Sequence, residues 1–418
     1  MTRNLRLLLA AQFVSLLGDG LYLAVIVNYA LRALGGSQRQ AGLVPVAESL
    51  PYLVLGIWAG VLVDRLDRRR VMMAADLLRA GVLAGLYAMD RRGLLADGGL
   101  PVLALLCASS ATLTVGSIFF NPARDALLPG LVQGGDLLRA NGAVAVSQHA
   151  AQLLGPLAAA LLLASRPMAE IFLWDAGSFL VSWAFLAAIR VPRWPRPAGG
   201  PVPDVRGALA YVAGRPDLKS LLLLTALNNL LLMGPVVVCS VFLVNETAAA
   251  GGGLVLPGWL GGRLSREAMF AVYMAAFSAG MILGTLLLAR LGRGVARWKL
   301  LALGILLDGL TFLPFEPLAR GGRFPLLVLA LLVHALVVPL INVLRPAILQ
   351  THVPAERQGQ VFALVNLTVF GGTALSALLA NGLLATGMLP SRMFTLVAIG
   401  GTLSGLLALG LKPLRRLV

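Results

Sequence analysis

The chain has 418 residues, of which 58% are hydrophobic and only 12% are charged, and its formal net charge is +16. A soluble domain carries about twice that charged fraction, so the composition excludes a soluble globular protein and predicts a polytopic membrane protein. The positive charge is spread over short loops rather than gathered on one solvated face, so we expect no nucleic-acid partner. The 47 glycines fit helices that pack closely in lipid.

A membrane span needs about 20 apolar residues. The hydrophobic pattern predicts twelve spans, at residues 7–32, 41–63, 71–90, 100–121, 141–164, 169–189, 220–244, 267–289, 298–315, 325–345, 361–385 and 391–411. A segment rich in Pro, Gly and Arg, residues 190–203, cannot cross a membrane and divides these spans six and six. We therefore expect an all-α membrane protein with an N-terminal six-helix bundle (1–190), a cytoplasmic linker with an amphipathic helix (191–219) and a C-terminal six-helix bundle (220–418).

The distribution of Lys and Arg predicts the orientation of these spans. With both termini in the cytoplasm, the inner segments hold 23 Lys and Arg residues and the outer loops hold 10. Cytoplasmic loops carry the excess of positive charge in membrane proteins. We expect a multi-pass protein of a bacterial cytoplasmic (inner) membrane with both termini inside.

Two segments repeat between the halves. Asn121-Pro-Ala-Arg124, at the end of span four, is matched by Asn342-Val-Leu-Arg345 at the end of span ten. The loop after span two, Asp64-Arg-Leu-Asp-Arg68, has a weaker counterpart after span eight. Two parallel six-helix repeats place a binding site near the membrane midplane, between the halves.

The spacing of Gly60, Asp64 and Arg65 resembles the loop between helices two and three of major facilitator transporters, and the resemblance extends over essentially the full chain. Within that superfamily the chain is similar to the drug-efflux branch that includes macrolide-efflux proteins, enterobactin exporters and lysophospholipid transporters. Three segments carry this finer resemblance: 64–69, 121–141 and 349–361.

The resemblance implies a cytoplasmic charge latch between helices, which breaks when the two halves rock. Its residues would be Gly60, Asp64, Arg65, Arg68, Arg69 and Arg124, with Asp64 meeting Arg124. The alternative is that the arginines only enforce the topology. Gly155-Pro156 on span five resembles the antiporter motif of exporters, in which a proline kinks the helix.

Few ionisable residues lie at membrane depth, where each costs about 2.5 kcal/mol or more. Asp19 on span one and Glu48 on span two fall at similar height, so we interpret them as candidates for proton coupling. Asp19 is the main candidate, and Glu48 is its neighbour or the contact for a cationic substrate. The alternative for Asp19 is a structural hydrogen bond to Gln12, Asn28 or water.

Other polar residues inside the spans have weaker interpretations. Asp76 and Arg79 have the i, i+3 spacing of a local ion pair, which we read as structural. Asp308 remains unassigned. His334 can titrate near neutral pH, although a lone histidine among Leu and Val is more often a packing residue. The candidates for lining the substrate cavity are Asn28, Asn228, Asn229, His334 and Asn342.

The leading hypothesis is a secondary active transporter that exports a lipophilic or amphipathic small molecule, drug-like or a siderophore, by proton antiport with alternating access. Alternatives are a flippase for lysophospholipid or a lipid precursor and, less favoured, a non-transporting membrane scaffold. An enzyme is not expected, because the chain has no phosphate loop, metal cluster or nucleophile–base set. We expect no cofactor and no metal, a small-molecule substrate and protons as partners, and a monomer in the lipid bilayer.

Overall fold

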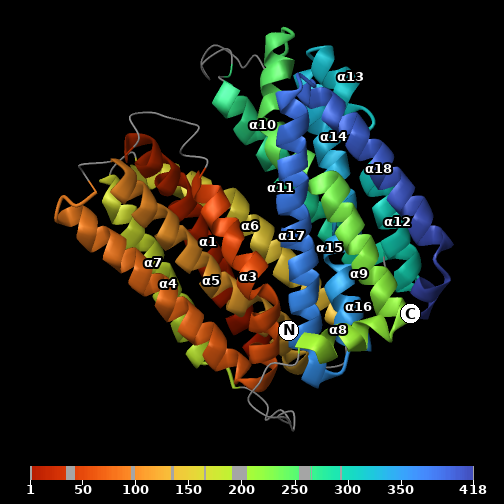
Figure 1. The fold of residues 1–418 in the computed structure, drawn as a ribbon, viewed down its shortest axis with the longest axis horizontal. Helices are drawn as coiled ribbons and strands as arrows, with labels where there is room; N and C mark the ends of the chain where they lie inside the picture. Colours follow the sequence, from red (N-terminus) through yellow and green to blue (C-terminus); the bar gives the residue numbers. More distant parts are fainter. Residues whose placement is uncertain are drawn as a thin grey trace. The chain divides into compact units, whose positions relative to one another are not determined.

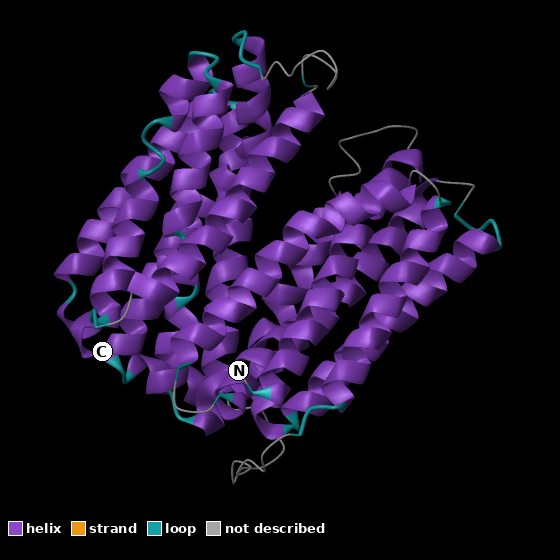
Figure 2. Ribbon diagram, turned by 180° about the vertical axis from the view of Figure 1, so that it is seen from behind, coloured by secondary structure: helices purple, strands orange, loops and turns teal. Residues whose placement is uncertain are grey.

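Helices make up most of the described chain, and no strand occurs within it (Figure 2). The computed structural model describes residues 2–33, 43–95, 99–132, 136–163, 166–190, 205–253, 264, 266–291 and 294–417. These helices fall into two compact units (Figure 1). The first unit contains residues 1–209 and 349–367, and the second contains 210–348 and 368–418.

Six long helices build the first unit. They are α1 (Arg3–Ala33), α3 (Leu43–Arg65), α4 (Arg68–Arg91), α5 (Gly99–Leu131), α6 (Leu137–Leu163) and α7 (Met168–Ala187). Helix α7 packs along both α1 and α4, α5 packs against α3 and α4, and α6 packs against α1. The turn between α3 and α4 is short because Asp67 caps α4: its carboxylate accepts the backbone N–H of Arg70 at 3.1 Å.

The second unit has the same kind of elements, several of them broken. In chain order they are α9 (Pro216–Asn228), η1 (Asn229–Met233), α10 (Gly234–Ala249), α11 (Arg266–Leu291), α12 (Arg297–Leu310), α13 (Phe315–Arg320), α14 (Phe324–Val337), α15 (Pro339–Asn342), α16 (Leu344–His352) and α18 (Pro390–Gly410). Helices α16 and α17 (Gln358–Ala385) contribute to both units, because residues 349–367 belong to the first; the short η3 (Ala355–Arg357) precedes α17, and η4 (Lys412–Arg416) follows α18. The π-helical turn η1 continues α9 into α10 without a break.

Length and composition qualify ten described helical segments as membrane spans. Helices α3 and α6, with 23 and 27 residues, are also long enough to cross a bilayer. Together these make the twelve helices that the sequence predicts. Large apolar side chains such as Val54, Leu100 and Leu378 remain exposed, as expected of helices that meet lipid.

The predicted linker lies partly outside the described residues, because residues 191–204 do. Its second part contains the short helix α8 (Val205–Ala213), which is followed by the start of α9 at Pro216. The division of the chain at 190 and 220 stays a prediction. Contacts group residues 349–367, from the C-terminal half of the sequence, with the first unit.

Candidate functional site

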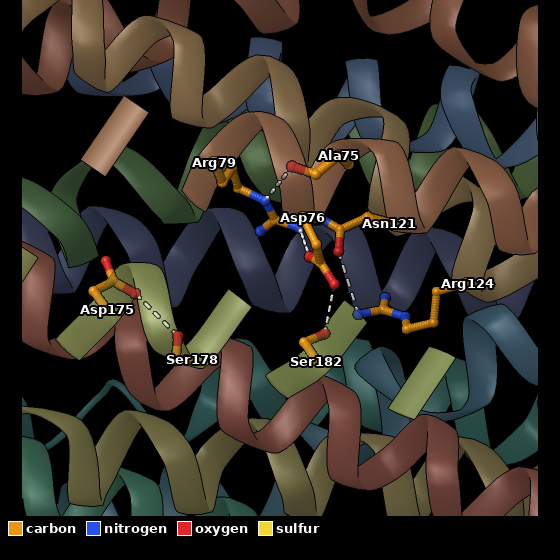
Figure 3. Close-up of polar contacts among 8 residues, drawn as sticks. All are labelled: Ala75, Asp76, Arg79, Asn121, Arg124, Asp175, Ser178 and Ser182. Atoms are coloured by element: carbon orange, nitrogen blue, oxygen red, sulfur yellow. Dashed lines mark hydrogen bonds and ion pairs between the residues drawn. The ribbon is translucent and has the colours of Figure 1, made fainter. Parts of the chain in front are cut away.

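A buried ion pair on α4 is the centre of the polar cluster in the first unit (Figure 3). The guanidinium of Arg79 donates to Asp76 Oδ1 at 2.9 Å, and the two side chains are 3% and 0% exposed. Ser182 on α7 donates its hydroxyl to Asp76 Oδ2 at 2.6 Å. The i, i+3 spacing predicted this ion pair, and the structure shows it in the α4–α7 interface.

Aromatic rings and a glycine hold Arg79 in place. Its guanidinium carbon lies 4.9 Å from the ring centroid of Phe120 on α5 and 4.4 Å from that of Phe179 on α7. Both contacts are within cation–π range. A Cβ atom at Gly116 would lie 2.8 Å from Arg79 Cγ, so only a glycine leaves room for the arginine stem. The charge of Arg79 is therefore fixed at one place in the bundle.

A second buried carboxylate lies on α7 (Figure 3). Asp175 is 1% exposed, and its Oδ1 accepts a hydrogen bond from Ser178 at 3.2 Å. Its other oxygen, Oδ2, is buried and has no hydrogen-bond partner among the described residues. Asp175 was not among the predicted proton-coupling residues. The same rule that selected Asp19, an acid inside a predicted span, could have found it.

The two predicted proton-coupling acids lie near this cluster. Asp19 on α1 and Glu48 on α3 are both partly buried, and their two carboxyl groups interact electrostatically. Asp19 interacts electrostatically with Arg79 and with Asp175. Helices α1, α4 and α7 therefore each bring one acid, Asp19, Asp76 and Asp175, into interaction with a single guanidinium. The roles of Asp19 and Glu48 in coupling stay predictions.

The predicted latch residues lie around the α3–α4 turn. Arg68 is buried and donates to the Ala126 carbonyl at 2.8 Å and to the Ala355 carbonyl at 2.6 Å. Arg69 donates to the carbonyls of Ala187 and Ile189, at 3.3 and 2.7 Å. Arg69 thus binds carbonyl groups at the C-terminal end of α7, where unpaired acceptors collect, and Arg68 joins α5 to η3.

The remaining latch residues are less completely described. Arg124 contacts Asp125 at 2.7 Å and the side chain of Asn121 at 3.3 Å. The side chain of Asp64 lies outside the described residues, so its predicted contact with Arg124 stays a prediction. Arg65 ends α3 and is partly buried.

Gly60 lies where α3 meets the start of α17. A Cβ atom built on Gly60 would collide with the Cβ of Ala363 and with the backbone carbonyl of Gly359. One turn earlier on α3, a Cβ on Gly56 would only touch Leu367, at 4.0 Å. The two helices are therefore in backbone contact at Gly60 and separate toward Gly56.

A glutamine from residues 349–367 makes two hydrogen bonds that the sequence did not indicate. Gln350 accepts a hydrogen bond from the side-chain amide of Asn141 at 2.5 Å and donates to the Asp125 carbonyl at 2.9 Å. Gln358 in turn donates to the Gln350 carbonyl at 3.1 Å. Asn141 and Gln350 are 209 residues apart in the sequence, so no local pattern could have paired them.

The second unit contains its own buried polar cluster. Asp308 on α12 is 3% exposed and accepts a hydrogen bond from Asn228 at 3.2 Å. His334 on α14 places Nε2 3.8 Å from Asp308 and bonds Thr311 at 2.9 Å through Nδ1. Its ring also lies 4.0 Å, between centroids, from the ring of Phe312. The sequence did not predict that Asp308 and His334 would meet.

Two other predicted cavity residues, Asn229 and Asn342, differ in burial. Asn229 is buried and donates to the Thr225 carbonyl within its own helix, at 2.8 Å, whereas Asn342 is exposed. The side chain of Asn28 lies outside the described residues, and so does that of Pro156. A Cβ on Gly155 would lie 2.9 Å from Gly20 Cα, so α6 crosses α1 in close backbone contact there. The predicted roles of these residues in substrate binding and helix kinking stay predictions.

Comparison with known proteins gives consistent matches over most of the chain. The sequence profile of the Major Facilitator Superfamily matches residues 8–262. Macrolide efflux protein A of Streptococcus pyogenes is 26% identical, over 89% of this chain and 88% of its own length. Multidrug efflux pump Tap of Mycolicibacterium fortuitum is 27% identical, over 99% of this chain and 97% of its own. A crystal structure of a bacterial homologue of the iron transporter ferroportin, in an outward-facing state, superposes with a TM-score of 0.79 at 16% identity, covering 98% of this chain and 99% of that one.

Proposed function

The chain belongs to the Major Facilitator Superfamily, and from that premise we propose that it exports a lipophilic or amphipathic small molecule by proton antiport. Membership makes it a multi-pass membrane transporter of small molecules rather than an enzyme. The predicted fold class and the predicted resemblance to macrolide-efflux proteins are confirmed. The direction of transport, the coupling ion and the substrate class are the proposal.

The acids buried in the first unit are the observation that supports proton coupling best. A charged group at membrane depth is costly and marks ion pathways and proton relays in transporters. Here Asp19 and Asp175 interact electrostatically with one guanidinium, that of Arg79, which hydrogen bonds to a third acid, Asp76. A fourth acid, Glu48, interacts with Asp19. Carboxyl groups in excess of their cations are suited to bind and release protons as the site opens to each side.

The same excess of acids favours neutral or cationic organic substrates over anionic ones. An anionic substrate needs several cations in its cavity, and Arg79 is already bonded to Asp76. Two of the relatives above are efflux proteins by name, one for macrolides and one for multiple drugs. Both points support export of a drug-like compound, with a siderophore as the alternative substrate.

The proposal includes an orientation and an assembly state. The excess of Lys and Arg in the predicted inner segments supports a cytoplasmic position for both termini, and the bacterial relatives support a bacterial inner membrane. We propose that the chain works as a monomer by alternating access. In that cycle the contacts of Gly60 and Arg68 with residues 355–363 form and break.

Export of lipophilic cationic dyes, measured as proton-driven uptake into everted membrane vesicles, tests this function. The native chain should move at least one dye when the vesicles are energised, and Asp19→Asn should abolish this movement. Glu170→Gln is the matched control, because Glu170 is a partly exposed acid of the same unit that pairs with Arg166 at 3.8 Å. Unaltered efflux in Asp19→Asn would refute the coupling role of Asp19.

The lipid-flippase alternative gives a different result in the same preparation. A flippase would move a fluorescent lysophospholipid between leaflets, would leave the dyes in place and would be insensitive to Asp19→Asn. A non-transporting scaffold would move neither class of molecule although it is well expressed.

A further inference from the structure

We propose that the carboxyl groups of Asp19 on α1 and Asp175 on α7 share one exchangeable proton, and that Asp175 is a proton-binding residue of the transport cycle. This inference rests on the proposed function and deepens it, because it adds to the predicted coupling acid a partner that the sequence did not indicate.

The first observation is the unpartnered oxygen of Asp175. Its carboxyl group is buried on α7, and only Oδ1 has a hydrogen bond, from Ser178 at 3.2 Å. The second oxygen, Oδ2, has no partner within the described part of the chain. A buried carboxylate oxygen without a donor is strongly disfavoured when it carries charge. A proton on Asp175 removes that charge.

The second observation is the close packing of α1 on α7. A Cβ atom on Gly18 would overlap both Asp175 Oδ1 and Ser178 Oγ, so only a glycine allows the carboxyl group to reach the α1 backbone here. The next residue of α1 is Asp19, and its charge acts on Asp175. The close approach at Gly18 therefore brings the Asp175 carboxyl group to the turn of α1 that carries Asp19.

The third observation is the charge balance around this crossing. Helix α7 packs against α1, α4 and α6. Asp175 interacts electrostatically with Asp19 and Tyr22 on α1 and with Arg79 on α4, and the buried titratable residue of α6 is His149. His149 bonds to Gln152 at 2.9 Å on its own helix. The hydrogen bonds of Arg79 go to Asp76 and to the Ala75 carbonyl, so Arg79 neutralises Asp76.

Because the charge of Arg79 is balanced by that of Asp76, Asp19 and Asp175 have no further cation among the groups named above. Two carboxylates in one poorly solvated site cannot both ionise at low cost, and they titrate as a pair rather than singly. With one proton between them, the pair carries a single negative charge. When the O–H bond on one carboxyl group breaks and that on the other forms, neither the charge nor the number of protons in the pair changes.

This arrangement assigns different tasks to the two acids. Asp19 is partly exposed and can exchange its proton with water or with a cationic substrate, whereas Asp175 is closed off from solvent and stores it. A cationic substrate that approaches Asp19 favours its ionised form and releases the shared proton. Loss of the Asp175 carboxyl group should therefore remove the stored proton and reduce the coupling of transport to protons. Asp19, which would meet the substrate, stays in place.

Infrared difference spectroscopy of the full chain in lipid, titrated with pH, tests the proposal with the proton itself as the probe. The native chain should show the carbonyl stretch of a protonated carboxyl group at neutral pH. This band should disappear in Asp175→Asn, should change in Asp19→Asn and should persist in Glu170→Gln. An unchanged band in Asp175→Asn overturns the proposal.

Two further measurements keep the result decisive. Asp175→Glu retains a carboxyl group, so the band should persist at a shifted frequency even if Asp175→Asn fails to fold; an unshifted band overturns the assignment to this residue. In everted vesicles, Asp175→Asn should lower proton-driven dye uptake, which reports export, at least tenfold. Loss of the band without any loss of efflux overturns the role in transport.

The export function and the shared proton can be refuted independently. If the native chain moves no dye, the proposed export function fails, and the infrared band still decides whether the pair holds a proton. If the native chain exports dye and the band is insensitive to residue 175, export stands and the shared-proton pair is refuted.

Discussion

The contact between α3 and α17 at Gly60 gives a prediction that can be worked out from the structure. In Gly60→Ala, the new methyl group would meet the Cβ of Ala363 and the carbonyl group of Gly359 well inside the usual contact distance of about 3.5–4.0 Å. One of these neighbours is backbone, which cannot rotate away. The two helices must therefore move apart, or the methyl group must be accommodated under strain.

Overpacking of this kind costs typically about 1–3 kcal/mol. Since every 1.4 kcal/mol is about tenfold, the population of the state with this contact should fall roughly 5- to 150-fold relative to states without it. For a unit of this size, the cost corresponds to a melting temperature lower by about 2–4 °C per kcal/mol. We expect the first unit of Gly60→Ala to melt several degrees below the native chain.

Gly56→Ala is the matched control. It makes the same change on the same helix, one turn away, where the nearest atom of α17 is a side-chain methyl group of Leu367 at 4.0 Å. This variant should melt within about a degree of the native chain or slightly above it, because alanine is the better helix former. The assay is thermal unfolding of purified protein in detergent, followed by size-exclusion chromatography. Equal melting temperatures for Gly60→Ala and Gly56→Ala would refute the backbone contact.

Three other changes test the buried polar contacts. Arg79→Met should abolish stable expression, because it leaves the buried Asp76 carboxylate without its cation at a cost of about 3–5 kcal/mol. The double variant Arg79→Met with Asp76→Asn should again give a monodisperse protein. If it does not, the pairing is contradicted. Gln350→Leu removes one of the two acceptors of the Asn141 amide and the donor to the Asp125 carbonyl, and it should destabilise the fold by about 1–3 kcal/mol, seen as a lower melting temperature; no change would show that this bridge is dispensable. Asp308→Asn keeps an acceptor for the amide on α9 and should melt close to the native chain, whereas Asp308→Leu should melt clearly lower; equal melting of the two variants would argue against that hydrogen bond.

Local patterns accounted for much of the architecture. Stretches of apolar residues set by the thickness of a bilayer predicted the positions of the spans to within a few residues, although several helices continue past the predicted ends, as α5 does to Leu131. The spacing of Asp76 and Arg79 predicted their ion pair because residues three apart on a helix are neighbours whatever surrounds them. The importance of Gly60 came from the resemblance to a family motif.

Contacts between distant parts of the chain were outside the reach of such patterns. Asp175 is an ordinary acid in a predicted span until α1 packs on α7 and Gly18 brings it beside Asp19. Asp308 and His334 likewise come into contact only because α12 packs against α14.

The sequence by itself determined that the chain is a helical membrane protein of twelve spans, because hydrophobic length and the local repeat of a helix are properties of consecutive residues. Only the tertiary structure decided which polar side chains share a site. A glycine lets two helices approach, and that approach determines whether a buried carboxyl group finds a cation, a hydroxyl group or another acid. The groups that interact with Asp175 are one hydroxyl group and a second acid, and the proposed shared proton depends on that placement.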